Sequence, residues 1–90
     1  MGKAIVHPQE LRRFAHDLKR FNLELHNQLS ALHGRLLELG QTWRDQEQKK
    51  FTEEFEKTMK VLSRFVHASD EHIPFLLRKA DRVDEYLQHR

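Results

Sequence analysis

Hydrophobic residues recur at steps of three and four through the first half of the chain. The series is Leu11, Phe14, Leu18, Phe21, Leu25, Leu29, Leu32, Leu36 and Leu39. This spacing is that of one face of a helix. Pro8 suits the first position of a helix, and Gly40, which follows the last periodic residue, is typical of a C-terminal cap. The pattern therefore predicts a helix over residues 8–39.

The second half carries a similar series. Its members are Phe51, Phe55, Thr58, Leu62, Phe65, Ser69, Ile73, Leu76, Ala80, Val83 and Leu87. Thr42 and Asp45 stand before it with the spacing of a capping box, in which the Thr42 hydroxyl accepts from the backbone N–H of Asp45 and the carboxylate reaches back. We predict a helix over 43–88, joined to the first by a turn at 40–42. A link this short makes the two helices antiparallel neighbours.

Pro74 lies inside the second predicted helix. Proline cannot donate to the carbonyl four residues earlier, which belongs to Asp70, and its ring crowds that carbonyl. We expect either a kink at 70–74 or a break into a short third helix, and the sequence does not decide between them.

The apolar stripes are wider than the contact between two helices requires. Adjacent apolar pairs widen them, namely Leu36-Leu37, Val61-Leu62, Phe65-Val66 and Leu76-Leu77. A lone hairpin of this length also buries little apolar area. We predict an all-α fold in which residues 1–90 form one helical-hairpin domain that dimerises into a four-helix bundle. The alternative is a monomer with a third helix folded back. The predicted interface and core residues are Leu18, Phe21, Leu25, Leu29, Leu32, Phe51, Phe55, Leu62, Phe65, Ile73 and Leu76.

Composition narrows the class of protein. The 90 residues include 16 Lys and Arg, 14 Asp and Glu, and no Cys, which excludes a disulfide scaffold and a thiolate zinc site. No apolar run approaches the roughly 20 residues that span a bilayer, and the stretch before His7 is too short for a signal peptide. The positive charges form no large patch, so we expect no nucleic-acid partner. The chain is predicted to be cytoplasmic, or secreted without a cleaved signal peptide.

The sequence offers no pattern for catalysis or for a cofactor. There are seven His residues, but none has Glu three residues before it, and no His-x-x-x-His spacing occurs. Gly-rich phosphate loops and nucleophile elbows are also absent from the sequence. We predict a non-enzymatic protein without metal, cofactor or catalytic residues.

Two aromatic residues are candidate contacts for a partner. Trp43 is the only Trp, and it either closes the end of the hairpin core or anchors a partner, a role in which Trp is favoured. Phe75 follows Pro74 on a flank that need not face the other helix. It is either a core residue of the dimer or a partner anchor.

Two helices of similar length, a tight turn and a Trp at that turn resemble the WXG family, the small helical-hairpin proteins related to the early secreted antigen of mycobacteria. Family members carry Trp-x-Gly at the turn, often with an aromatic residue eight positions after the Trp. Here Trp43-Arg44-Asp45 is a variant of that motif, and Phe51 is the later aromatic. The capping role predicted for Asp45 explains how it can replace the glycine.

The resemblance implies a homodimer, or a heterodimer with a related hairpin, that acts as a substrate or partner of a type VII-like secretion system and contacts its machinery or a larger protein. The family's export signal is a Tyr followed four residues later by Asp or Glu. In this chain Tyr86 is followed at that distance by Arg90. The alternative is therefore a cytoplasmic dimerisation or adaptor module that scaffolds a larger complex and is not exported.

Overall fold

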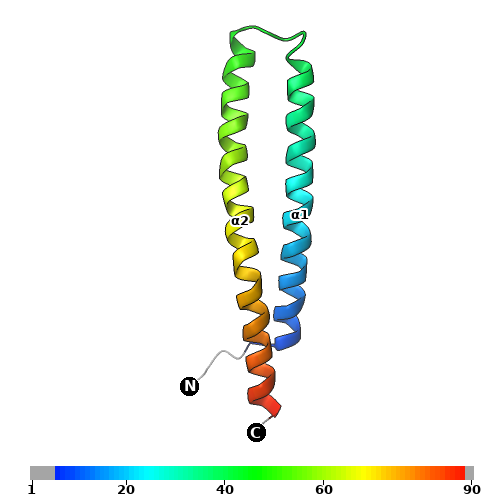
Figure 1. The fold of residues 1–90 in the computed structure, drawn as a ribbon, viewed down its shortest axis with the longest axis vertical. Helices are drawn as coiled ribbons and strands as arrows, with labels where there is room; N and C mark the ends of the chain where they lie inside the picture. The colour runs from blue at the N-terminus through cyan, green and yellow to red at the C-terminus, as the bar shows by residue number, and fades with distance from the viewer. Residues whose placement is uncertain (1–5, 89–90) are drawn as a thin grey trace.

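Two long antiparallel helices make up the fold, as Figure 1 shows for a computed structural model that describes residues 6–88. Helix α1 runs Pro8–Leu39 and helix α2 runs Gln46–Gln88. They lie side by side in a rod of 67 × 24 × 15 Å. No strand occurs between residues 6 and 88, which confirms the predicted all-α hairpin. Residues 1–5, which make up most of the stretch considered for a signal peptide, and Arg90 lie outside the described residues.

The ends of α1 follow from its flanking residues. His7 is extended, with φ −78° and ψ 118°, and Pro8 occupies the first turn. At the other end, the N–H of Gly40 donates to the carbonyls of Leu36 and Leu37. Gly40 has φ −64° and ψ −12°, so it closes the helix in the right-handed region and does not use the conformational freedom of glycine.

Helix α2 begins at Gln46, three residues later than predicted, and the predicted capping box is wrong. The Asp45 carboxylate accepts from the N–H of Gln48 at 3.0 Å, which makes Asp45 the N-cap. The Thr42 hydroxyl instead donates to the carbonyl of Leu39 at 3.4 Å, at the end of α1. Because an aspartate next to the first turn supplies the cap, Thr42 is left outside the helix and the connection covers residues 40–45.

Pro74 does not interrupt α2, so the predicted alternative of a break into a third helix is wrong. The helix is continuous from Gln46 to Gln88 with Pro74 inside it. Both Pro74 and Asp70 are exposed, so water can bond the carbonyl that proline leaves without a donor. Ile73, the residue before the proline, is buried. Its packing holds α2 against α1 next to Pro74.

The seam between the helices is narrower than the apolar stripes. Buried or half-buried positions in α1 include Leu11, Ala15, Leu18, Asn22, Leu25, Leu29, His33 and Leu36. Those in α2 include Thr52, Phe55, Met59, Leu62, Val66, Ser69, Ile73, Leu76, Ala80 and Val83. Ala15 and Ala80 have no exposed surface. Small side chains at these two positions let the helices approach closely.

Four of the predicted core residues lie outside this seam. Phe21, Leu32, Phe51 and Phe65 are each about half exposed, so they do not belong to the core of the hairpin. The physical reason is that a pair of helices buries only one strip of each. Of the other predicted residues, Leu18, Leu25, Leu29, Phe55, Leu62, Ile73 and Leu76 are buried or half-buried.

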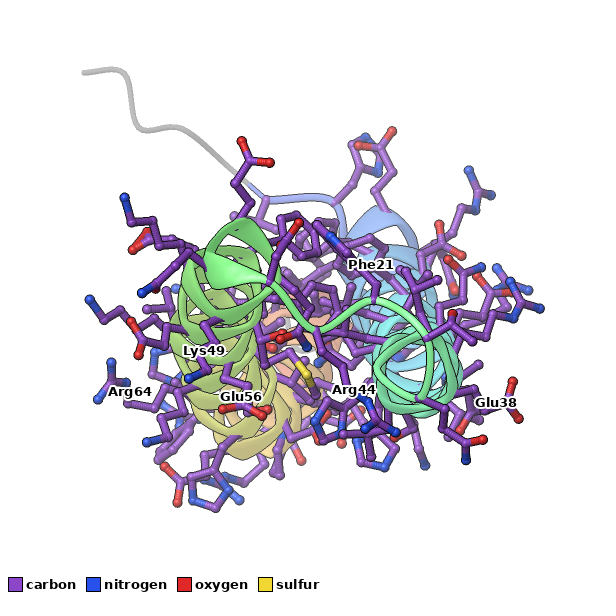
Figure 2. All side chains as sticks on the ribbon, turned by 90° about the horizontal axis from the view of Figure 1, so that it is seen from above. Phe21, Glu38, Arg44, Lys49, Glu56 and Arg64 are labelled. Carbon is purple, nitrogen blue, oxygen red and sulfur yellow. The ribbon has the colours of Figure 1, made fainter. Side chains whose placement is uncertain are left out.

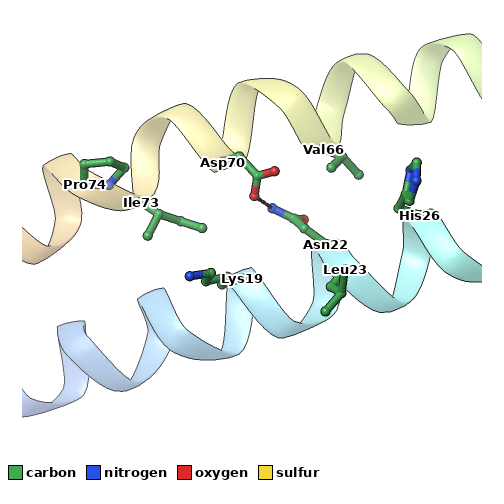
Figure 3. Close-up of a pocket in the computed structure, with 8 residues that line it drawn as sticks. All are labelled: Lys19, Asn22, Leu23, His26, Val66, Asp70, Ile73 and Pro74. Carbon is green, nitrogen blue, oxygen red and sulfur yellow. Dashed lines mark hydrogen bonds between the residues drawn. The ribbon is translucent and has the colours of Figure 1, made fainter.

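A polar side chain occupies the middle of the seam. Asn22 is 2% exposed, and its amide nitrogen donates to the Ser69 hydroxyl at 2.7 Å. The same nitrogen donates to the Asp70 carboxylate at 2.9 Å (Figure 3). Its Oδ1 atom is buried without a hydrogen-bond partner. A buried acceptor without a donor costs about 1–3 kcal/mol, so this residue weakens the seam.

Replacing Asn22 with Leu should therefore stabilise the hairpin. Removing the unpaired acceptor and adding an apolar side chain should raise the free energy of unfolding by about 1 kcal/mol, or Tm by roughly 4–8 °C for a chain of this size. Thermal unfolding followed by circular dichroism measures this. Asn27→Leu, at an exposed position of the same helix, is the control and should change Tm little. A lower Tm for Asn22→Leu would show that the hydrogen bonds outweigh the orphaned oxygen.

Candidate protein-interaction surfaces

Each residue of the Trp43-Arg44-Asp45 motif makes a different local contact at the turn. The rings of Trp43 and Phe51 pack at 6.4 Å between centroids, tilted by 38°. The Nε of Arg44 donates to the carbonyl of Gly40 at 3.2 Å. Asp45 caps α2. A cation at the end of α1 and an anion at the start of α2 are both favourable to the helix dipoles.

The Trp43 ring belongs to an aromatic cluster that joins the two helices near the turn. The cluster consists of Trp43, Phe51, Phe55 and His33. Phe51 and Phe55 pack at 6.1 Å, and His33 stacks on Phe55 at 6.3 Å with 10° between the ring planes. Trp43 is half-buried. The packing of Trp43 on Phe51 supports a structural role, in which the ring closes the end of the hairpin core. The exposed part of the ring is accessible to a partner.

Large apolar side chains gather on one side of the hairpin, and we call this surface the apolar face; Leu23 and Leu37 are exposed on the opposite side. Each residue of the apolar face directly precedes a residue of the seam or of the end of α1. Because both helices are right-handed and run antiparallel, residues in that position fall on the same side of the pair. Figure 2, seen along the long axis, has Phe21 on one side of the two helices and Glu56 on the other. The members are Phe14, Phe21, Leu32 and Leu39 of α1 and Phe51, Val61 and Phe65 of α2, with exposures of 48–57%.

The opposite side, the polar face, carries the ionic contacts between the helices. The Arg12 guanidinium lies 2.7 Å from the carboxylates of both Asp81 and Asp84. These hydrogen bonds, that of Asp81 first, raise the pKa of Arg12 above its ordinary value. Closer to the turn, His33 Nε2 lies 3.4 Å from a carboxylate oxygen of Glu56. An open groove over Asn22 lies on the same face, bordered by Lys19, Leu23, His26 and Asp70 (Figure 3).

Phe75 lies on the same flank of α2 as Val61, toward the free end of the helix. It is 58% exposed and directly precedes the seam residue Leu76, and the fourteen residues from Val61 to Phe75 make nearly four whole turns of the helix. Arg78 stands over its ring with the guanidinium carbon 4.6 Å from the centroid. The sequence raised Phe75 as a possible core residue of a dimer or a partner anchor, and its exposure in the hairpin leaves both open.

Sequence reasoning missed three seam residues of α1. Ala15, Asn22 and His33 occupy the places that the apolar series gave to Phe14, Phe21 and Leu32. Their spacing with Leu18, Leu25, Leu29 and Leu36 has the same steps of three and four. That spacing could have located the seam. A search for large apolar residues passes over it, because two of these three residues are polar and the third is small.

Asp45→Ala should lower the free energy of unfolding by about 1 kcal/mol, because the first turn of α2 loses its cap. Asp45→Asn retains a side-chain acceptor and should be nearly neutral. Chemical denaturation of the three proteins measures the difference. Equal losses for Ala and Asn would attribute the effect to the charge at the helix end rather than to the cap.

Trp43→Ala should destabilise the turn end of the hairpin. A fully buried Trp contributes about 3–5 kcal/mol on truncation, and since Trp43 is half-buried we expect roughly half of that. Trp43→Phe keeps an aromatic ring beside Phe51 and should recover most of the loss. An unchanged Tm for Trp43→Ala would remove the structural role and leave only the role of a partner anchor.

Within residues 6–88, no helix has the length and apolar character needed to cross a membrane. No three His, Asp or Glu side chains in that range gather as a metal site would require.

Comparison with known proteins identifies the family of this hairpin. Searches of curated proteins and of solved structures gave no match. The family model WXG100, described as proteins of 100 residues with WXG, matches residues 4–86. The match spans nearly the whole chain and includes both helices and the turn motif, so this protein belongs to the WXG100 family.

Proposed function

We propose that the chain is a non-enzymatic protein–protein interaction module whose apolar face pairs with the same face of another hairpin. The observation that carries this proposal is that seven of the large apolar side chains that the hairpin leaves exposed gather on one side of it. Soluble monomers rarely expose contiguous apolar surfaces of this kind. Covering the face with a second helix pair yields a four-helix bundle.

A second copy of the chain or a related hairpin fits this face. Two copies would pair about a two-fold axis with Phe21, Phe65 and their neighbours on both sides of the contact. Burial stabilises by roughly 25 cal/mol for each Å² of apolar surface removed from water, and aromatic residues contribute most area. The ionic contacts of Arg12 and His33 lie on the other face and would stay at the surface of the bundle.

Membership of the WXG100 family supports a role as a small substrate or partner of a type VII-like secretion system. In that role the half-buried Trp43 and the turn would form the bundle end that the machinery or a larger protein contacts. The chain would be made in the cytoplasm and secreted without a cleaved signal peptide.

One observation favours a second candidate function. Arg90 stands four residues after Tyr86, where the family's export signal has an acidic residue. On this alternative the bundle is a cytoplasmic adaptor that scaffolds a larger complex. Detection of the full-length chain in the culture medium, with a cytoplasmic marker absent from it, would decide for export.

Phe21→Asp combined with Phe65→Asp tests the pairing. Since both side chains are exposed in the hairpin, the double variant should keep its helices but form no bundle, because pairing would bury its charges. Light scattering should give the unchanged chain a mass near twice 10.9 kDa, and the variant a mass near one chain. Leu23→Asp, at an exposed position of the polar face, is the control and should pair normally. A double variant that pairs normally would show that this face is not the interface.

A further inference from the structure

At three places in α1, a large apolar residue is exposed and the smaller or more polar residue after it is buried or half-buried. Phe21 is 50% exposed, for example, whereas Asn22 is 2% exposed. A lone hairpin would remove more apolar surface from water in the opposite arrangement, and that removal is the main force that stabilises a fold. Another interaction must therefore hold these apolar side chains outside the seam. The three pairs are Phe14-Ala15, Phe21-Asn22 and Leu32-His33.

The opposite arrangement needs only a small rotation of α1 about its own axis. Neighbouring residues are roughly 100° apart around a helix, and Leu18, Leu25 and Leu36 belong both to the apolar series and to the seam. A rotation through part of that angle would bring Phe21 toward α2 and carry Asn22 outward, while these leucines stay in contact with α2. The hairpin would then cover much of its apolar face by itself.

Polar contacts on the other side of the seam oppose this rotation. Within residues 6–88, the side-chain hydrogen bonds and ion pairs between α1 and α2 come from Arg12, Asn22 and His33. These residues lie on the side of α1 that the rotation would carry away from α2. Hydrogen bonds weaken steeply when their geometry is distorted, so the rotation would break these contacts.

Asn22 supplies the buried contact of this set. Its amide nitrogen donates to the Ser69 hydroxyl at 2.7 Å and to the Asp70 carboxylate at 2.9 Å (Figure 3). The Ser69 hydroxyl donates in turn to the carbonyl of Val66 at 3.2 Å, which leaves the hydroxyl oxygen to accept from Asn22. A buried polar residue that costs stability can select one arrangement of helices, as a single buried Asn does in coiled coils.

We propose that Asn22 fixes the rotation of α1 through its bonds to Ser69 and Asp70. This rotation keeps Phe14 and Phe21 at the surface, so that the apolar face stays available to a second hairpin and is not covered by the hairpin's own helices. The proposal rests on the function proposed above, pairing through the apolar face. Without the bonds of Asn22, the chain would remain a folded hairpin but would pair weakly.

Ser69→Ala with Asp70→Ala removes both acceptors of the Asn22 amide. The side-chain amide of Asn22 should then become as accessible to a soluble paramagnetic agent as that of the exposed Asn27, which serves as the internal reference. NMR of the ¹⁵N-labelled full chain measures this accessibility. Light scattering over a range of concentrations should show that the dissociation constant of the pair rises about tenfold, while circular dichroism shows unchanged helix content.

Two further variants distinguish a rotation of α1 from a general loss of stability. The matched control, Ser63→Ala with Glu71→Ala, removes a hydroxyl and a carboxylate at exposed positions of α2 and should change neither the Asn22 amide nor pairing. Asn22→Leu should restore pairing when it is added to the double variant, because an apolar side chain at this position favours the same rotation and needs no acceptor.

Three results would overturn the proposal. The first is an Asn22 amide that stays shielded in the double variant, whatever happens to pairing. The second is normal pairing by a variant whose Asn22 amide is exposed. The third is a triple variant, with Asn22→Leu, that still pairs weakly.

A double variant that loses its helices is replaced by Asp70→Ala alone, which keeps Ser69 as an acceptor. This variant should expose the Asn22 amide in part and raise the dissociation constant about threefold, and a shielded amide would again contradict the proposal. The amide measurement does not depend on pairing. Failure of the unchanged chain to pair would therefore contradict the proposed function, whereas the amide alone decides whether Asn22 fixes the rotation.

Discussion

Two helices share a single seam, and most features of this protein follow from that constraint. The seam is one strip wide, and Ala15 and Ala80 are completely enclosed in it. Phe55 is half-buried in this strip, whereas Phe14, Phe21, Phe51 and Phe65 are left outside it. They remain on one flank, where they form the apolar face. The surface that we propose for pairing thus consists of apolar side chains that the seam leaves outside.

The fold could be predicted from the sequence because its determinants are local. Steps of three and four, Pro8 at the start of α1 and a connection of a few residues are enough to indicate an antiparallel hairpin. The division of the stripe between core and surface could not be predicted in this way. Periodicity locates the centre of an apolar stripe, whereas the seam depends on how closely the partner helix approaches. Phe21 and Asn22 are neighbours in sequence, and only the structure shows that the asparagine takes the buried place.

The turn shows how a motif can change while its geometry is kept. Each residue of Trp43-Arg44-Asp45 makes its own contact: the ring packs on α2, the guanidinium donates to the carbonyl of Gly40 just after α1, and the carboxylate caps α2. Asp45 was expected from the sequence to serve as a cap, but with Thr42 as its partner. The sequence places two good capping residues three positions apart, and the competition between them is decided by where the chain leaves α1.

The contacts between the helices differ widely in the length of chain that they enclose. His33 and Glu56 are 23 residues apart, Asn22 and Ser69 are 47 apart, and Arg12 and Asp81 are 69 apart. The entropy lost on closing a loop increases with its length, so the aromatic cluster at the turn forms at the smallest entropic cost and each later contact depends on those before it. We therefore expect the free end of the hairpin to open before the turn. Phe75 and Tyr86 lie on α2 toward that free end, whereas Trp43 lies in the connection between the helices.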